Sequence, residues 1–427
     1  MFGLHDSTAR LGRFTAALLL PVVFALVCSL ALSGSDKNKN AKAAADQAKA
    51  PKKIDYSNIV WPNPPAIARI RYMNWFASEQ QQRNEQGNVQ KKSKWMDRLA
   101  GTQTQEEVFK LPFSLVQPNG MAIDSKGRVY IADSKVGGIF IVNPETRASE
   151  ILKHGVNGNF THIIGLAMDD NDRLFISDPV LRHVLVLSSD HKPEDVITDS
   201  MARPTGLALD TKNRLLYVAD TDLDQVLVYD ADTFKLLRKI GRSGHNHELT
   251  TPGDFSKPTG LTVDDEGNLY VCDTMNNRIE VFDADGTFIQ AYGKNGDAPP
   301  NFARPKGVAI DSDGHIWVAD GVQDRVSVFN KEWRLLISIG GHGLAPGQFS
   351  SLENVVSDTK RNMIYTTEIY PGRLQAFRYI TDAEADQLRK EREQMRTESA
   401  PKPLTPKPAA AAEAKPPQAA NPQPQPK

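Results

Sequence analysis

The chain has 427 residues, of which 40% are hydrophobic and 24% charged, and its formal net charge is −1 at pH 7. With two cysteines, Cys28 and Cys272, it holds no C-x-x-C zinc pair and no C-x-x-C-H haem attachment sequence. Residues 111–380 contain 27 Lys and Arg against 36 Asp and Glu, and so lack the bulk positive charge that nucleic acid binding needs. We therefore expect no nucleic acid partner.

Residues 1–33 form the first predicted segment, an export signal. Two arginines precede an apolar run over residues 14–32, which is close to the roughly 20 residues that span a bilayer. Three outcomes stay open: cleavage after Ala31, retention as a membrane anchor, or lipidation of Cys28. All of them predict an extracytoplasmic protein, in the periplasm or at the cell envelope, with membrane contact through this segment where it is retained.

Residues 34–53 are rich in Ala and Lys without apolar periodicity, which predicts a disordered linker. Within residues 54–110, apolar and basic residues alternate from Ile67 to Trp75, and this alternation predicts a strand. We expect Ala66–Phe76 to pack on the last of the repeats that follow, and Trp95–Leu99 to form a short docked helix.

Residues 111–380 repeat a unit of four short strands. In the clearest copy, residues 257–293, each run is β-branched or aromatic and bounded by Gly, Asp or Asn, which is typical of an antiparallel meander. The residue that ends the first strand recurs as Asp124, Asp169, Asp210, Asp264, Asp311 and Asp358. A period of roughly 40 to 50 residues with four strands per unit predicts an all-β fold, a six-bladed β-propeller of four-stranded antiparallel blades.

Three repeats begin with closely similar sequences, RPTGLALD, KPTGLTVD and RPKGVAID, at residues 203, 257 and 304. Together with the following YVAD and R-[IV]-x-V-F-[DN] strands, these motifs resemble the NHL repeat. The order of the N-terminal pieces resembles a bacterial group of exported or membrane-tethered NHL proteins. The resemblance implies a propeller over residues 111–380 but no single activity, because six-bladed propellers include both enzymes and binding modules.

The residue before each P-x-G lies in the loop that enters the innermost strand of a blade, so these residues should meet around one mouth of the central channel. They are Gln117, His162, Arg203, Lys257, Arg304 and Ser351. The next ring inward consists of Asn119, Ile164, Thr205, Thr259, Lys306 and Glu353. The cationic members predict a site for an anionic group or an acidic segment of a partner. The alternative is that they pair with neighbouring Asp residues.

A second set of charged positions also repeats. The second strand ends at Asp133, Asp178, Asp220, Asp273, Asp320 and Glu368. Arg278, Arg325 and Arg373 follow five residues later in three blades. We expect these carboxylates to cap the turns and the arginines to pair with them, rather than to form a second basic ring.

Asn119, Glu353 and Asn354 offer oxygen ligands that suit a hard cation such as calcium. The sequence QPNG at 117–120 also resembles the Asn-Gly turn of gluconolactonase-like hydrolases, and this resemblance implies a calcium-dependent hydrolase or lyase as the alternative function. Amidating lyases resemble the repeat too, but need several His ligands, and only His162 occupies a ring position. Lys306 should neutralise Glu353, so we expect no metal and no cofactor.

After the last blade, Thr381 and Glu384 form a capping-box pattern that predicts a solvated helix over residues 381–398. Residues 399–427 are dominated by Pro, Ala, Lys and Gln and predict a disordered tail.

These observations favour a binding or scaffold module that presents a loop-built face to a protein, peptide or glycan partner at the cell envelope. Two alternatives remain, the calcium-dependent hydrolase or lyase and an accessory protein that docks electron-transfer partners. The discriminating feature is whether Lys306 bonds Glu353 at the mouth.

Overall fold

The computed structural model describes residues 55–78, 114–146, 148–155, 158–243 and 251–399. The export segment, the linker, the Trp95–Leu99 helix and the C-terminal tail all lie outside these ranges. Within them, no helix combines the length and the apolar character that crossing a membrane requires.

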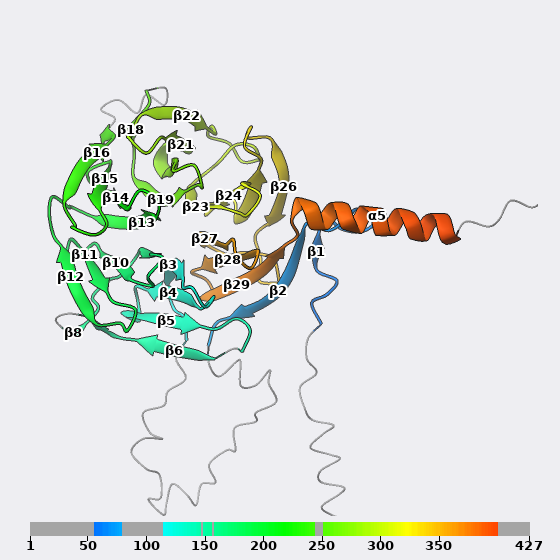
Figure 1. Ribbon diagram of the computed structural model, residues 1–427, viewed down its shortest axis with the longest axis horizontal. Helices are drawn as coiled ribbons and strands as arrows, with labels where there is room; N and C mark the ends of the chain where they lie inside the picture. Colours follow the sequence, from blue (N-terminus) through cyan, green and yellow to red (C-terminus); the bar gives the residue numbers. More distant parts are fainter. Residues whose placement is uncertain (1–54, 79–113, 147, 156–157, 244–250, 400–427) are drawn as a thin grey trace, which may run out of the picture.

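Six antiparallel sheets surround a central axis (Figure 1), which confirms the predicted six-bladed β-propeller. Blade one contains β3 (Pro118–Ile123), β4 (Val129–Asp133), β5 (Gly138–Val142) and β6 (Ser149–Leu152). Blade two contains β9 (Leu166–Met168), β10 (Leu174–Asp178), β11 (His183–Leu187) and β12 (Pro193–Ile197). Blade three contains β13 (Pro204–Asp210), β14 (Leu215–Asp220), β15 (Gln225–Asp230) and β16 (Leu236–Ile240).

The second half of the ring follows the same order. Blade four contains β19 (Pro258–Val263), β20 (Leu269–Asp273), β21 (Arg278–Phe282) and β22 (Phe288–Tyr292). Blade five contains β23 (Pro305–Ile310), β24 (Ile316–Asp320), β25 (Arg325–Phe329) and β26 (Leu335–Gly340). Blade six contains β27 (Leu352–Asp358), β28 (Met363–Glu368) and β29 (Arg373–Tyr379). Two short pairs, β7 (His154–Gly155) with β8 (Gly158–Asn159) and β17 (Arg242–Ser243) with β18 (Asp254–Phe255), lie between blades.

Blade six takes its fourth strand from the N-terminal side of the chain. Strand β2 (Ile70–Phe76) pairs antiparallel with β29, from Ile70 opposite Tyr379 to Phe76 opposite Leu374, and β1 (Val60–Trp61) adds an outer edge. Tyr72 packs edge-on against Phe377, with 5.5 Å between the ring centroids. The alternation seen in the sequence thus places one face of β2 in the core between blades five and six.

The glycine of P-x-G is explained by the close approach of neighbouring inner strands. A Cβ atom on Gly206 would lie 1.9 Å from the carbonyl oxygen of Thr259, and one on Gly260 would lie 2.3 Å from that of Lys306. Such contacts are sterically impossible, so only glycine lets the strands meet there. In blade six the same position holds Asn354, whose Oδ1 accepts a hydrogen bond of 2.8 Å from the backbone N–H of Val355.

Helix α5 (Asp382–Ser399) begins at the capping box and projects away from the ring (Figure 1). The backbone N–H of Thr381 donates to Glu384, and that of Glu384 donates to the Thr381 hydroxyl, at 2.9 and 3.2 Å. Asp382 forms an ion pair with Arg69, which directly precedes β2, so the helix starts beside the closing strand.

Candidate functional site

The strand register brings the predicted ring residues to one face of the propeller. In blade three, Pro204 at the start of the inner strand pairs with Asp220, and Asp220 pairs with Gln225 across the next turn. The other blades follow the same pattern. We call this side the mouth face and define it by the residues before the inner strands, at 117, 162, 203, 257, 304 and 351, and by the turns between the second and third strands, at 133–138, 178–183, 220–225, 273–278, 320–325 and 368–373.

The inner ring contains one ion pair that joins two blades. Lys306 Nζ lies 2.5 Å from Glu353 Oε2, and the two side chains are 26% and 21% exposed. The carboxylate that would be the strongest calcium ligand is therefore already neutralised by a lysine. Asn119 is buried, and its Nδ2 donates to the Gln117 carbonyl and to Ser134 Oγ at 2.8 and 2.9 Å. Two of the three residues of the calcium hypothesis, Glu353 and Asn354, thus already use a side-chain oxygen in a bond inside the protein.

The remaining inner-ring residues link neighbouring blades. Thr205 Oγ1 lies 2.6 Å from Thr221 Oγ1, which donates 2.8 Å to the carbonyl of Pro258 in the next blade. Blade four repeats this arrangement through Thr259 and Thr274. The Thr367 hydroxyl closes the ring by donating 2.8 Å to the Asn119 carbonyl. This belt of hydroxyls satisfies carbonyl groups that would otherwise be left without partners at the blade junctions.

The outer ring is less uniform. Lys257 Nζ pairs with Asp222 at 3.2 Å, as the alternative interpretation requires. Arg203 and Arg304 are exposed and have no carboxylate partner among the residues that the structure describes. Ser351 is also exposed, whereas Gln117 and His162 are half-buried. The mouth face therefore presents two uncompensated cationic side chains at the positions that the repeat predicts.

The carboxylates that end the second strands cap the neighbouring loops, as expected. Asp133 Oδ2 accepts from the backbone N–H groups of Val116 and Gln117, at 2.6 and 3.1 Å. Asp320 and Glu368 receive equivalent bonds from Ala303 and Ser350 in their own blades. Each carboxylate thereby fixes the loop that leads into its inner strand.

The arginine partners are confirmed in two blades and wrong in the third. Arg278 Nε lies 2.8 Å from Asp273 Oδ2, and Arg373 pairs with Glu368. Arg325 forms no such pair within the described ranges; it is half-buried at the start of β25. In blade five, Asp320 is instead saturated by backbone N–H groups from both loops, so it holds its position without the arginine.

Blade four contains a second buried carboxyl beside the Arg278–Asp273 pair. Glu280 ion-pairs with Arg278, and its Oε2 accepts 2.8 Å from the backbone N–H of Gly253. Burial raises the pKa of Glu280 to about 7, while the Arg278 charge and the Gly253 bond act in the opposite direction. Burial also raises the pKa of Asp273. Glu280 lies on β21, the third strand of blade four, and is not among the residues that line the channel cavity.

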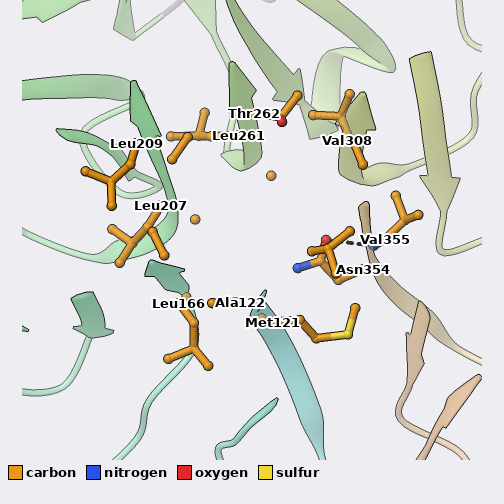
Figure 2. Close-up of a pocket in the computed structure, with 18 of the residues that line it drawn as sticks. Met121, Ala122, Leu166, Leu207, Leu209, Leu261, Thr262, Val308, Asn354 and Val355 are labelled. Atoms are coloured by element: carbon orange, nitrogen blue, oxygen red, sulfur yellow. Dashed lines mark hydrogen bonds between the residues drawn. The ribbon is translucent and has the colours of Figure 1, made fainter. Parts of the chain in front are cut away.

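The central channel holds a cavity of about 300 Å³ below the glycine positions. Figure 2 shows its wall of apolar side chains, including Met121, Leu166 and Leu207, with Thr262 and Asn354 as the labelled polar residues. No titratable side chain occurs among the residues that line it. In the described ranges, no three His, Cys, Asp or Glu side chains converge as a metal site. The cavity therefore offers neither a general base nor a carboxylate ligand set.

The sequence-based argument missed the apolar residues of the mouth face. The turn between the second and third strands carries exposed large hydrophobic side chains in five blades: Val180, Leu181, Leu223, Met275, Val322 and Tyr370. A signal for them was present in the sequence, because an apolar residue stands two or three positions after the second-strand carboxylate in each of these repeats.

The ring of six blades defines the chain as a six-bladed β-propeller. A family model described as the SMP-30/gluconolactonase/LRE-like region matches residues 181–299, and the NHL repeat model matches residues 302–329. Together with the repeats of the remaining blades, these matches support the predicted NHL-repeat propeller. Propellers of this kind support either a binding scaffold or a gluconolactonase-like hydrolase.

Curated relatives include both kinds of protein. A gluconolactonase of Zymomonas mobilis is 26% identical over 200 residues, which cover 42% of this chain and 55% of that protein. NHL repeat-containing protein 2 of Bos taurus is 24% identical over 285 residues, which cover 62% of this chain and 35% of that protein. The chain thus spans about half or about a third of the length of these relatives.

Two solved structures are similar to this chain at low identity. A gluconolactonase of Xanthomonas campestris is 18% identical with a TM-score of 0.49, covering 62% of this chain and 86% of that one. A streptogramin B lyase is 12% identical with a TM-score of 0.47, covering 64% of this chain and 96% of that one.

Proposed function

We propose that this protein is a binding module that uses the mouth face to hold a protein or peptide partner at the cell envelope, without bond chemistry. The observation that carries the proposal is the Lys306–Glu353 pair of 2.5 Å, which occupies the mouth where a catalytic cation would be expected. The belt of hydroxyl bonds around it adds rigidity. A rigid face built from six repeated loops suits recognition, because little conformational entropy is lost on binding.

The location at the envelope rests on the apolar run over residues 14–32 and on the basic residues before it. Fractionation of cells that express the full chain checks this part of the proposal. We expect the protein in the envelope or periplasmic fraction, and its recovery with the cytoplasmic proteins would contradict the location without touching the binding argument.

The binding role is tested by cross-linking the immobilised full chain to an envelope extract and comparing two double variants. Arg203→Glu with Arg304→Glu reverses the charge of the mouth face, and Lys126→Glu with Lys360→Glu makes the same change at exposed lysines on the opposite face. We expect a cross-linked partner to be lost only with the first pair. If both double variants capture the partner equally well, the proposal that the mouth face binds this partner is contradicted. Protease treatment of the extract separates a protein partner from a glycan.

A second candidate, a calcium-dependent hydrolase, is supported by the gluconolactonase-type match over residues 181–299. That match does not include Asn119, Glu353 or Asn354, the residues that would hold the ion. Metal analysis and thermal melting with calcium or EDTA distinguish the candidates, since a bound ion raises the melting temperature by mass action. The binding proposal expects no difference. A stoichiometric metal with an EDTA-sensitive melt that is lost in Glu353→Ala would favour the hydrolase.

A further inference from the structure

The mouth face carries apolar side chains at one structural position of the blade. They occur in the turn between the second and third strands, and they include Val180 at 63%, Met275 at 50%, Val322 at 59% and Tyr370 at 60% exposure. Isolated exposed hydrophobic residues are normal on protein surfaces, whereas an arrangement around a single face marks an interaction site. This set recurs at the same position of the repeat in five of six blades, and all of its members lie on the mouth face.

The turns that carry these side chains are fixed by hydrogen bonds. Asp178 Oδ1 accepts from the backbone N–H groups of Val180 and Leu181, both at 3.0 Å. Asp320 Oδ1 accepts from those of Val322 and Gln323, both at 3.0 Å. These bonds fix the backbone of the turns, and the apolar side chains on them are exposed. In blade one, by contrast, Val136 packs against the core.

The exposed charges of the mouth face are mostly positive. Arg182, Arg203 and Arg304 are exposed, Lys257 pairs with the exposed Asp222, and the carboxylates that end the second strands are buried. Arg203 and Arg304 keep no carboxylate partner in the described ranges, although residues 111–380 are net acidic overall. The local excess is small, so it suits a few carboxylates better than the continuous charge of a nucleic acid.

Basic and apolar residues occur together in three consecutive blades. Blade three presents Arg203 with Leu223, blade four presents Lys257 with Met275, and blade five presents Arg304 with Val322. We propose that this arc of the mouth face binds a protein segment in which acidic residues alternate with apolar ones. Its carboxylates pair with Arg203 and Arg304, and its apolar side chains pack on Leu223, Met275 and Val322. This inference rests on the proposed binding function and specifies the chemistry of its partner.

The test is a selection of displayed random peptides of about 12 residues on the purified full chain, followed by fluorescence anisotropy of the selected peptides. We expect the selected peptides to be enriched in Asp and Glu together with Phe, Leu or Trp. Their binding should weaken about tenfold in the Arg203→Glu, Arg304→Glu variant and in Val322→Asp, and weaken further as salt is raised from about 0.1 M. Leu237→Asp, an exposed change on the outer strand of blade three, serves as the matched control and should leave binding unchanged.

Several outcomes would overturn the inference and also separate it from the proposed function. If the selected peptides are instead basic or purely polar and still lose affinity in the mouth-face variants, the proposed acidic and apolar partner is refuted. That result would remain consistent with the proposed binding function. If no mouth-face variant alters peptide binding, both this inference and the proposed use of the mouth face are refuted. If the selection yields no peptide at all, this inference alone is refuted. A chain that sediments as a dimer and becomes monomeric in Val322→Asp would show that a second copy covers the face. Tighter binding of an RNA oligonucleotide would assign the arginines to nucleic acid.

Discussion

The buried group in blade four differs from its counterpart in blade six at two positions: Asp273 replaces Glu368, and Glu280 replaces Gln375. Glu280 follows Arg278 by two positions, and Gln375 follows Arg373 by two. Gln375 satisfies both ends of its amide, accepting from the Gly347 N–H and donating to Glu368 at 2.9 and 2.7 Å. Glu280 accepts from the Gly253 N–H in the same way but carries an ionisable carboxyl in a buried site. Blade four therefore has a pH-dependent group where blade six has a neutral one.

This difference predicts a pH effect on stability. The pKa of Glu280 is raised by burial to about 7 in the folded protein, above its unfolded value, so its favourable contribution is present at low pH and lost as pH rises through about 7. Glu280→Gln should stabilise the protein at about pH 8 by on the order of 1 kcal/mol and should flatten the dependence of the melting temperature on pH. Thermal melts of both proteins from about pH 5 to about pH 9 check it. A variant whose pH dependence matches that of the unmodified chain would show that Glu280 ionises normally.

At the scale of elements, the closing strand β2 contributes buried side chains to the core as well as a fourth strand to blade six. Ile70 and Tyr72 are each only 1% exposed, and both belong to the core shared by blades five and six. Their neighbour Met73 on the other side of the same strand is 41% exposed. The alternation means that the two faces of β2 should respond differently to truncation.

Tyr72→Ala should lower the free energy of unfolding by about 3–5 kcal/mol, because it leaves a cavity beside Phe377. Met73→Ala on the same strand should change it by no more than about 0.5 kcal/mol. Urea denaturation of the two variants measures both values. Similar losses for both would mean that β2 is held by its backbone bonds to β29 rather than by its buried face.

Strands and turns could be predicted from the sequence because their determinants are local. Each blade begins at a P-x-G motif or at a copy that keeps only part of it. The turns between strands contain Asp, Asn or Gly, so the repeat defines the order of the strands. The short pairs β7–β8 and β17–β18 could not be predicted in this way, since they lie in insertions between blades that follow no repeat.

At the scale of the whole molecule, the ring depends on close contact between inner strands. Gly206 and Gly260 let backbones of adjacent blades touch, and the hydroxyl belt bonds those same strands to one another. The residues of the mouth could be assigned to one ring from the sequence alone. The bonds between these residues could not be predicted from the sequence, because the distance from Lys306 to Glu353 depends on how closely blades five and six approach each other. The exposure of the apolar turn residues could not be predicted either, because an apolar residue in this turn can pack against the core, as Val136 does in blade one.

A side chain at the blade junction should disrupt the ring. Gly206→Ala places a Cβ atom 1.9 Å from the Thr259 carbonyl oxygen, so we expect a loss of about 3 kcal/mol or more, or failure to fold. Asn354→Ala, at the matching position of blade six, should lose only about 1 kcal/mol with the Val355 bond. Soluble yield and the urea midpoint report both effects. A stable Gly206→Ala protein would mean that the blades can move apart without loss of the ring.

Both ends of the folded ring leave from blade six. The N-terminal side arrives through β1 and β2, and α5 departs beside Arg69, whereas blade three lies across the ring from them in Figure 1. A mechanical pull between the two flanks would be borne by the β2–β29 hydrogen bonds and the Arg69–Asp382 pair. The backbone N–H of Asp382 also donates to Asp313 of blade five, so blades two to four would carry the least of this load. A partner held on blades three and four would therefore be shielded from tension along the chain.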